Sequence, residues 1–176
     1  AIKAANDYNR YFGGKKPAQA AQIAFAVAAH YSEKEQWEDV RKRLAGAMGL
    51  IDGKATLDVK VQAHALLGRT YVRMNRGQNA GAEYGTVVKL WSDPKKALAE
   101  IDALPEDEGA KQRRLGRALE AVGEALFYFA EQKRAKVDAV KFPEYKGPGT
   151  KEEVLKHIQT KVAEWINATG VDLEVL

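Results

Sequence analysis

Residues 61–94 restrict the fold of this chain more than any other stretch, because their apolar side chains recur with the period of two amphipathic helices. The stretch reads VQAHALLGRTYVRMNRGQNAGAEYGTVVKLWSDP. Gly68 lies on the first helix and Ala80 on the second, and residues this small let two helix backbones approach closely. The larger side chains around that contact are Leu67, Tyr71 and Tyr84. We therefore expect two packed helices joined by a tight turn.

A similar arrangement of apolar and small residues occurs 40 residues earlier in the chain. Ala28, for example, precedes Gly68 by this interval. Repetition at a fixed period of this length is the mark of a repeat architecture. The period predicts two helix–turn–helix units, over about 21–54 and 61–94, joined by residues 55–60.

The second unit resembles the tetratricopeptide repeat, a pair of helices with a Leu-Gly…Tyr…Ala…Phe pattern. The residues that carry the resemblance are Leu67, Gly68, Tyr71, Ala80 and Tyr84. His64 replaces the family's Trp, and the closing proline, Pro94, comes two residues late. A 40-residue period would also suit HEAT-type pairs, but the order of residues favours the tetratricopeptide repeat. The resemblance implies an all-α, right-handed solenoid of about seven to eight helices.

The segment after Pro105 predicts a long helix in the C-terminal half of the chain. Its apolar residues alternate at intervals of four and three and would form a core stripe: Leu115, Leu119, Val122, Leu126 and Phe129. We favour one helix from about 106 to 140, because residues 129–132 contain no turn signal. The alternative is a degenerate third unit over about 116–149. We expect residues 1–170 to form a single domain.

Two local features concern helix ends. Ser32 and Glu35 have the spacing of a capping box, which would start the helix that runs to about Ile51. The last helix, about 151–168, has an apolar face with little left to cover, so we expect Trp165 and its neighbours to be partly exposed or to contact another molecule. The alternative is that this helix folds back onto the long one and hides them, which the loop between Pro143 and Pro148 would permit.

The ends of the chain suggest a segment of a larger protein. The sequence begins at Ala1 within a helical pattern, and its last four residues match the start of a viral 3C protease site. We therefore expect residues 171–176 to be a tail derived from cloning. The parent resembles the large envelope-associated tetratricopeptide proteins of Gram-negative bacteria, and the compartment, bacterial periplasm or envelope or cytoplasm, stays open.

Nothing in the sequence predicts catalysis, a cofactor or a metal. The chain contains no cysteine, and His30, His64 and His157 are too scattered to form a ligand set, so we interpret them as structural. Gly13-Gly14-Lys15-Lys16 lacks the strand and the Ser or Thr of a phosphate-binding loop. No apolar run reaches the length of a membrane span, so we expect no membrane insertion.

Surface shape is the remaining guide to function. In the tetratricopeptide family, the first helix of each unit lines a concave groove that binds a protein or peptide. The resemblance places these residues of the chain in that groove: Gln22, Phe25, Gln62, Arg69, Arg73, Arg117, Glu120 and Glu124. The Lys and Asn residues of the family's carboxylate clamp are absent. Arg69 and Arg73, one helical turn apart, form either a double anchor for a carboxylate or two ordinary exposed arginines.

Three functions are compatible with these features. The first is a non-catalytic interaction module, or scaffold, that binds a partner on the concave face. The second is an architectural spacer, or a segment that forms a homo-oligomer through its uncapped ends. The third is an anion or nucleic-acid binder that uses the basic cluster at 111–117, which comprises Lys111, Arg113, Arg114 and Arg117. Nucleic acid is disfavoured because the cluster lacks interleaved aromatic residues.

Overall fold

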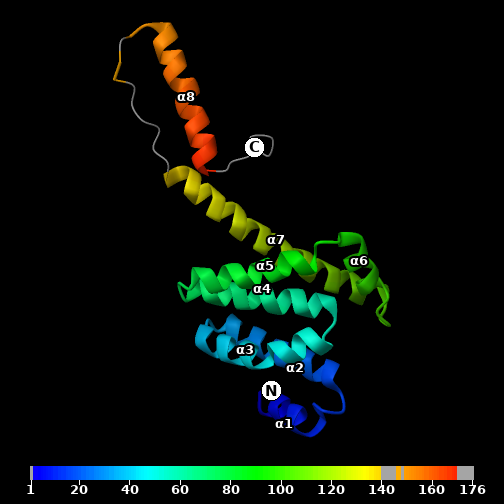
Figure 1. Ribbon diagram of the computed structural model, residues 1–176. Helices are drawn as coiled ribbons and strands as arrows, with labels where there is room; N and C mark the ends of the chain where they lie inside the picture. Colours follow the sequence, from blue (N-terminus) through cyan, green and yellow to red (C-terminus); the bar gives the residue numbers. More distant parts are fainter. Residues whose placement is uncertain (1, 140–145, 148, 170–176) are drawn as a thin grey trace. The chain divides into compact units, whose positions relative to one another are not determined.

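The structure, a computed structural model, describes residues 2–139, 146–147 and 149–169 (Figure 1). Within these residues it contains eight helices and no strand, which confirms the all-α prediction. The helices are α1 (Ile2–Phe12), α2 (Pro17–Glu33), α3 (Trp37–Lys54), α4 (Leu57–Arg73), α5 (Gly77–Leu90), α6 (Pro94–Asp102), α7 (Glu108–Ala139) and α8 (Lys151–Thr169). The predicted cloning tail, residues 171–176, lies outside the described residues.

The chain divides into two compact units, Ala1–Phe127 and Tyr128–Leu176, and each is described by itself. The predicted long helix is confirmed as α7, which is continuous through residues 129–132. The turn that a third helix–turn–helix unit over 116–149 would require there is therefore not formed. The single domain over 1–170 stays a prediction.

The 40-residue period is visible in the first compact unit as two helix pairs. Helix α4 begins and ends 40 residues after α2, and α5 begins 40 residues after α3. Helices α2 and α3 pack against each other, as do α4 and α5, and α3 packs on α4 to join the two pairs (Figure 1). Helix α1 packs on α2 and α6 on α4.

The two pairs turn in the same way, through a residue with a left-handed backbone. Glu35 and Asn75 both have a φ of 55°. In the first turn Glu35 N–H donates to the carbonyl of Ser32 at 3.0 Å, and Gln36 N–H donates to that of Tyr31 at 3.0 Å. This is the Schellman motif that ends a helix. The predicted capping box is therefore wrong: Ser32 belongs to the last turn of α2, and its hydroxyl donates to the carbonyl of Ala29.

Helix α4 is the central element of the first unit, because α2, α3, α5 and α6 all pack against it. Gly68 lies where α4 meets α5. A Cβ atom at Gly68 would stand 3.0–3.1 Å from three ring atoms of Tyr84, so the absence of a side chain allows this contact. The sequence-based assignment of Gly68 to a close helix contact is confirmed.

The part of α7 in the first unit buries only some of the predicted core stripe: Val122 is buried and Leu115 half-buried, but Leu119 and Leu126 are exposed. Its most buried residues are small: Ala118, Ala121, Val122 and Ala125. Leu119 and Leu126, assigned to the core stripe, are 48% and 54% exposed. Alanines allow a helix to approach its neighbours more closely than leucines do, and this rotates the leucines toward solvent.

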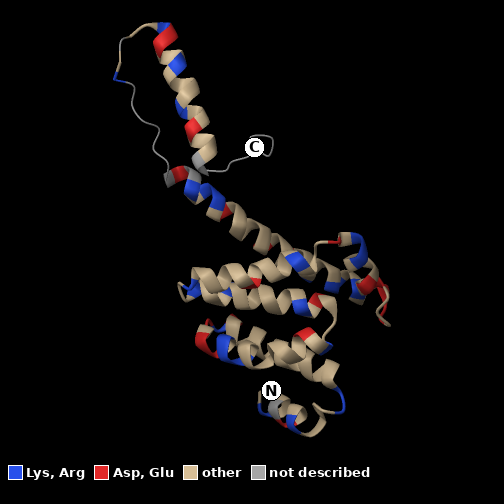
Figure 2. Ribbon diagram, in the orientation of Figure 1, with Lys and Arg blue, Asp and Glu red and all other residues tan. Residues whose placement is uncertain are grey.

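The second compact unit comprises the end of α7, from Tyr128, and α8. Trp165 is half-buried, while Leu155, Ile158 and Val162 are exposed. The expected partial exposure around Trp165 is thus confirmed within this unit. Lys and Arg alternate with Asp and Glu over most helices of the chain (Figure 2).

Candidate functional site: a groove between α2, α4 and α7

A groove runs between α2, α4 and α7 in the first compact unit. It consists of two hollows of about 270 and 180 Å³. The hollows adjoin, because Phe25 of α2, Gln62 of α4 and Arg117 of α7 line both. Glu106, which precedes α7, contributes to the wall of the larger hollow.

Six of the eight residues assigned to the concave face line this groove: Gln22, Phe25, Gln62, Arg69, Arg117 and Glu120. These residues were assigned to the groove from the positions that line it in the tetratricopeptide family, which the second unit resembles. Glu124 adjoins the groove through its bond to Arg69. Arg73 lines neither hollow, and its guanidinium carbon lies 5.8 Å from the ring centre of Trp37 on α3. That the eight residues bind a partner stays a prediction.

Arg69 of α4 is exposed, and its guanidinium is bonded to Glu124 of α7. Its Nε donates to one carboxylate oxygen at 2.8 Å, and Nη2 donates to the other. The Tyr84 hydroxyl donates to the same carboxylate at 2.7 Å. Hydrogen bonding to Glu124 raises the pKa of Arg69. Arg69 and Arg73 therefore contact different helices, α7 and α3 respectively, and the double carboxylate anchor stays a prediction.

Arg114 forms the second tie between α7 and the rest of the unit. Its Nε and Nη2 donate to the two oxygens of Glu106 at 2.7 and 2.6 Å, and Nη1 donates to Asp58 Oδ2 at 2.9 Å. Asp58, in the first turn of α4, is 1% exposed. The hydrogen bonds from Arg114 lower the pKa of Glu106. The same bonds, together with the bond to Asp58, raise the pKa of Arg114. Oδ1 of Asp58 is buried without a hydrogen-bond partner among the described residues.

In the basic cluster at 111–117, two of the four cations form ion pairs and two form none among the described residues. Arg114 is bound to two carboxylates, and Lys111 Nζ lies 4.0 Å from Asp102. Arg113 and Arg117 are exposed, and within the described part of the chain neither makes an ion pair or hydrogen bond. Both line the larger hollow, and Arg117 also lines the smaller one.

His64 has a role that the sequence did not reveal. Its Nδ1 lies 2.6 Å from Glu83 of α5, and its Nε2 lies 3.0 Å from Asp52 of α3. Burial tends to lower the pKa of His64, but its bonds to Glu83 and Asp52 outweigh this, so the pKa is raised. A charged imidazole that donates from both nitrogens fits this environment and links three helices. The carboxylates lie at opposite nitrogens of the ring and cannot share a metal ion, and the described residues contain no metal-binding cluster.

None of the helices in the described ranges is long and apolar enough to cross a membrane. The chain was compared with protein-family models, with curated proteins and with solved structures, and no match was found.

Proposed function

We propose that this chain is a non-catalytic protein-interaction module, a right-handed tetratricopeptide-like solenoid that holds a segment of a partner protein in the groove between α2, α4 and α7. The observation that carries the proposal is the convergence of six residues, assigned to a binding face from the sequence, on one groove.

The lining of the groove suits a peptide. Phe25, which is half-buried, offers apolar surface, and the side-chain amides of Gln22 and Gln62 can each donate to and accept from a peptide backbone. Each hollow is smaller than the roughly 300–1,000 Å³ usual for a small-molecule site. Two shallow hollows in a row favour an extended segment over a compact ligand.

The charges of the groove favour binding over catalysis. Asp58 and Glu106 are the carboxylates of the larger hollow, and both are hydrogen-bonded to Arg114. The pKa of Glu106 is lowered by its hydrogen bonds to Arg114, which makes this carboxylate a poor general acid. Because Arg114 is in turn occupied, it is a weaker candidate for nucleic acid than its sequence position indicated.

Self-association is a second candidate, and the exposed apolar residues favour it. Leu119 and Leu126 of α7, and Leu155 and Ile158 of α8, are each more than 40% exposed. Light scattering over a concentration series tests this candidate. A mass that rises with concentration, and that falls back to the monomer in a Leu155→Glu variant, would support a self-associating spacer.

A peptide selection tests the main proposal. Random 12-residue peptides, displayed between glycine-rich flanks so that no free carboxyl terminus is presented, are selected on the full chain. Selected peptides should bind the native chain and lose binding when Ala26→Trp fills the larger hollow, which the exposed Ala26 lines. The matched control is Ala45→Trp, at an exposed alanine of α3 that lines neither hollow. If the selected peptides bind both variants equally, or no peptide is selected, the groove is not the binding surface.

A further inference from the structure

The groove contains two exposed arginines, Arg113 and Arg117, that make no ion pair or hydrogen bond among the residues that the structure describes. Arg113 and Arg117 are one helical turn apart on α7, so their side chains project from the same face. Both line the larger hollow. We propose that the occupant of the groove is an extended segment with an Asp or Glu side chain placed at Arg113 and Arg117, next to an apolar residue. This inference rests on the proposed function and names its partner chemistry.

The neighbouring charges support an acidic occupant. Arg114 is matched by Asp58 and Glu106, with three donor–acceptor distances of 2.6–2.9 Å. Arg69 is matched by Glu124. These bonds pair the other charged groups of the groove with two exceptions: Glu120, which lines the smaller hollow, and Oδ1 of Asp58, which is buried without a hydrogen-bond partner among the described residues.

Arg117 determines where the acidic side chain would sit. It lies where the two hollows meet, together with Phe25 and Gln62. A guanidinium binds a carboxylate through two parallel hydrogen bonds, which fixes the position and direction of the bound group. Phe25 beside it offers an aromatic surface to an adjacent apolar side chain, and the amide of Gln62 can bond to the peptide backbone between them.

Glu120 restricts the pattern further. It is on α7, three positions after Arg117, and lines only the smaller hollow. A second acidic residue of the peptide at that end would face a like charge. The groove therefore favours a segment with its acidic residue at the larger hollow and a neutral or basic residue at the smaller one, rather than a uniformly acidic tract.

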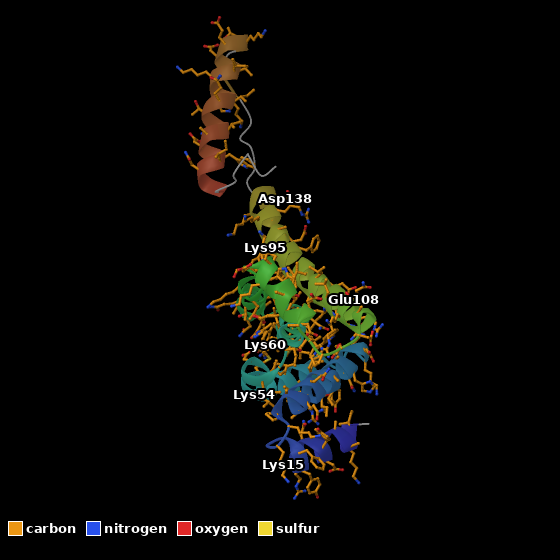
Figure 3. The ribbon with its side chains drawn as sticks, turned by 90° about the vertical axis from the view of Figure 1, so that its right-hand side faces the viewer. Lys15, Lys54, Lys60, Lys95, Glu108 and Asp138 are labelled. Atoms are coloured by element: carbon orange, nitrogen blue, oxygen red, sulfur yellow. The ribbon has the colours of Figure 1, made fainter. Side chains whose placement is uncertain are left out.

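The test compares peptide selections on charge-reversed variants. The groove variant carries Arg113→Glu and Arg117→Glu, and the control carries Lys95→Glu and Lys96→Glu at the exposed start of α6, where Lys95 is seen in Figure 3. Both variants change the net charge by the same amount. Peptides selected on the native chain should be enriched in one Asp or Glu beside an apolar residue. The groove variant should bind them about ten- to a hundredfold more weakly, while the control keeps their affinity.

A fresh selection on the groove variant should enrich Lys or Arg in place of Asp or Glu. Thermal unfolding followed by circular dichroism checks that both variants are folded. If peptides selected on the native chain depend on the groove, as judged by Ala26→Trp, but show no acidic preference, the acidic partner is refuted and the interaction module stands. An equal loss of affinity in the groove variant and the control would also refute it, because the effect would then be one of net charge. Peptides that ignore Ala26→Trp refute both proposals.

Discussion

Placing a methyl group at Gly68 tests the central packing contact of the fold. The Cβ of Gly68→Ala would meet Cε1, Cδ1 and Cζ of Tyr84 at 3.0–3.1 Å, which is shorter than an ordinary carbon–carbon contact of about 3.5–4.0 Å. Tyr84 cannot easily move away. Its ring is buried, and its hydroxyl is bonded to Glu124, which also holds Arg69.

The expected size of the effect follows from two opposing contributions. Overpacking a core costs about 1–3 kcal/mol, whereas replacing a helical glycine by alanine gains about 0.5–1 kcal/mol. Gly68→Ala should therefore destabilise the protein by about 0–2.5 kcal/mol, and Gly68→Leu, with three more carbons at the same place, by more. Gly123→Ala is the control: Gly123 is an exposed helical residue with no atom within 4 Å of its Cβ position, so this change should stabilise by about 0.5–1 kcal/mol.

Urea unfolding followed by circular dichroism measures the free energy of unfolding of the native chain and of each glycine variant. The difference between Gly68→Ala and Gly123→Ala isolates the contact with Tyr84, because helix propensity contributes to both. Replacing the Tyr84 ring by a smaller side chain should relieve the clash with the new methyl group. Gly68→Ala should therefore cost less stability in a Tyr84→Leu background than in the native one. If Gly68→Ala is as stable as Gly123→Ala, the two helices do not cross at Gly68, and the assignment of the repeat contact is wrong.

Three further predictions concern single residues. Glu35→Gly should stabilise by about 0.5–1 kcal/mol in urea unfolding, because glycine adopts the left-handed turn without the steric cost that glutamate incurs, and Asn75→Gly should gain less because asparagine tolerates that conformation. Because the pKa of His64 is raised on folding, its contribution to stability should be complete below about pH 6.5 and be lost as pH rises through the folded-state pKa; His64→Gln should flatten this part of the pH profile. Arg114→Met should destabilise by about 3–5 kcal/mol, because it leaves Asp58 buried without its partner, and the added change Asp58→Asn should recover part of the loss.

The sequence predicted the helices and their period because both depend on local patterns. Apolar spacing of three and four residues specifies a helix wherever the segment folds. The face of a helix that is buried depends instead on what packs against it. For α7 the leucines suggested one face, but the alanines Ala118 and Ala125 permit a closer approach and are fully buried, while Leu126 is exposed.

The residues that line the candidate site could be predicted in part, but their charge pairs could not. The resemblance to the tetratricopeptide repeat assigned Gln62 and Arg117 to a groove, and both residues line the larger hollow. It could not show which charges were already paired, since the partners are far apart in sequence. Arg69 and Glu124 are 55 residues apart, and Arg114 and Asp58 are 56 apart. A single sequence contains no signal that links such positions, so the available cations were found only from the structure.

The two long-range ties also determine how well the groove is prepared for a ligand. Arg114 fixes α7 to the first turn of α4, and Glu124 fixes it to Arg69 near the end of α4 and to Tyr84 of α5. These points are ten residues apart on α7, or about 15 Å along the helix, and Arg117 lies between them. A wall anchored at both ends of the binding surface loses little freedom when a segment binds, which lowers the entropic cost of association. Arg114 should therefore influence peptide affinity through the position of α7, even though its own guanidinium is committed to Asp58 and Glu106.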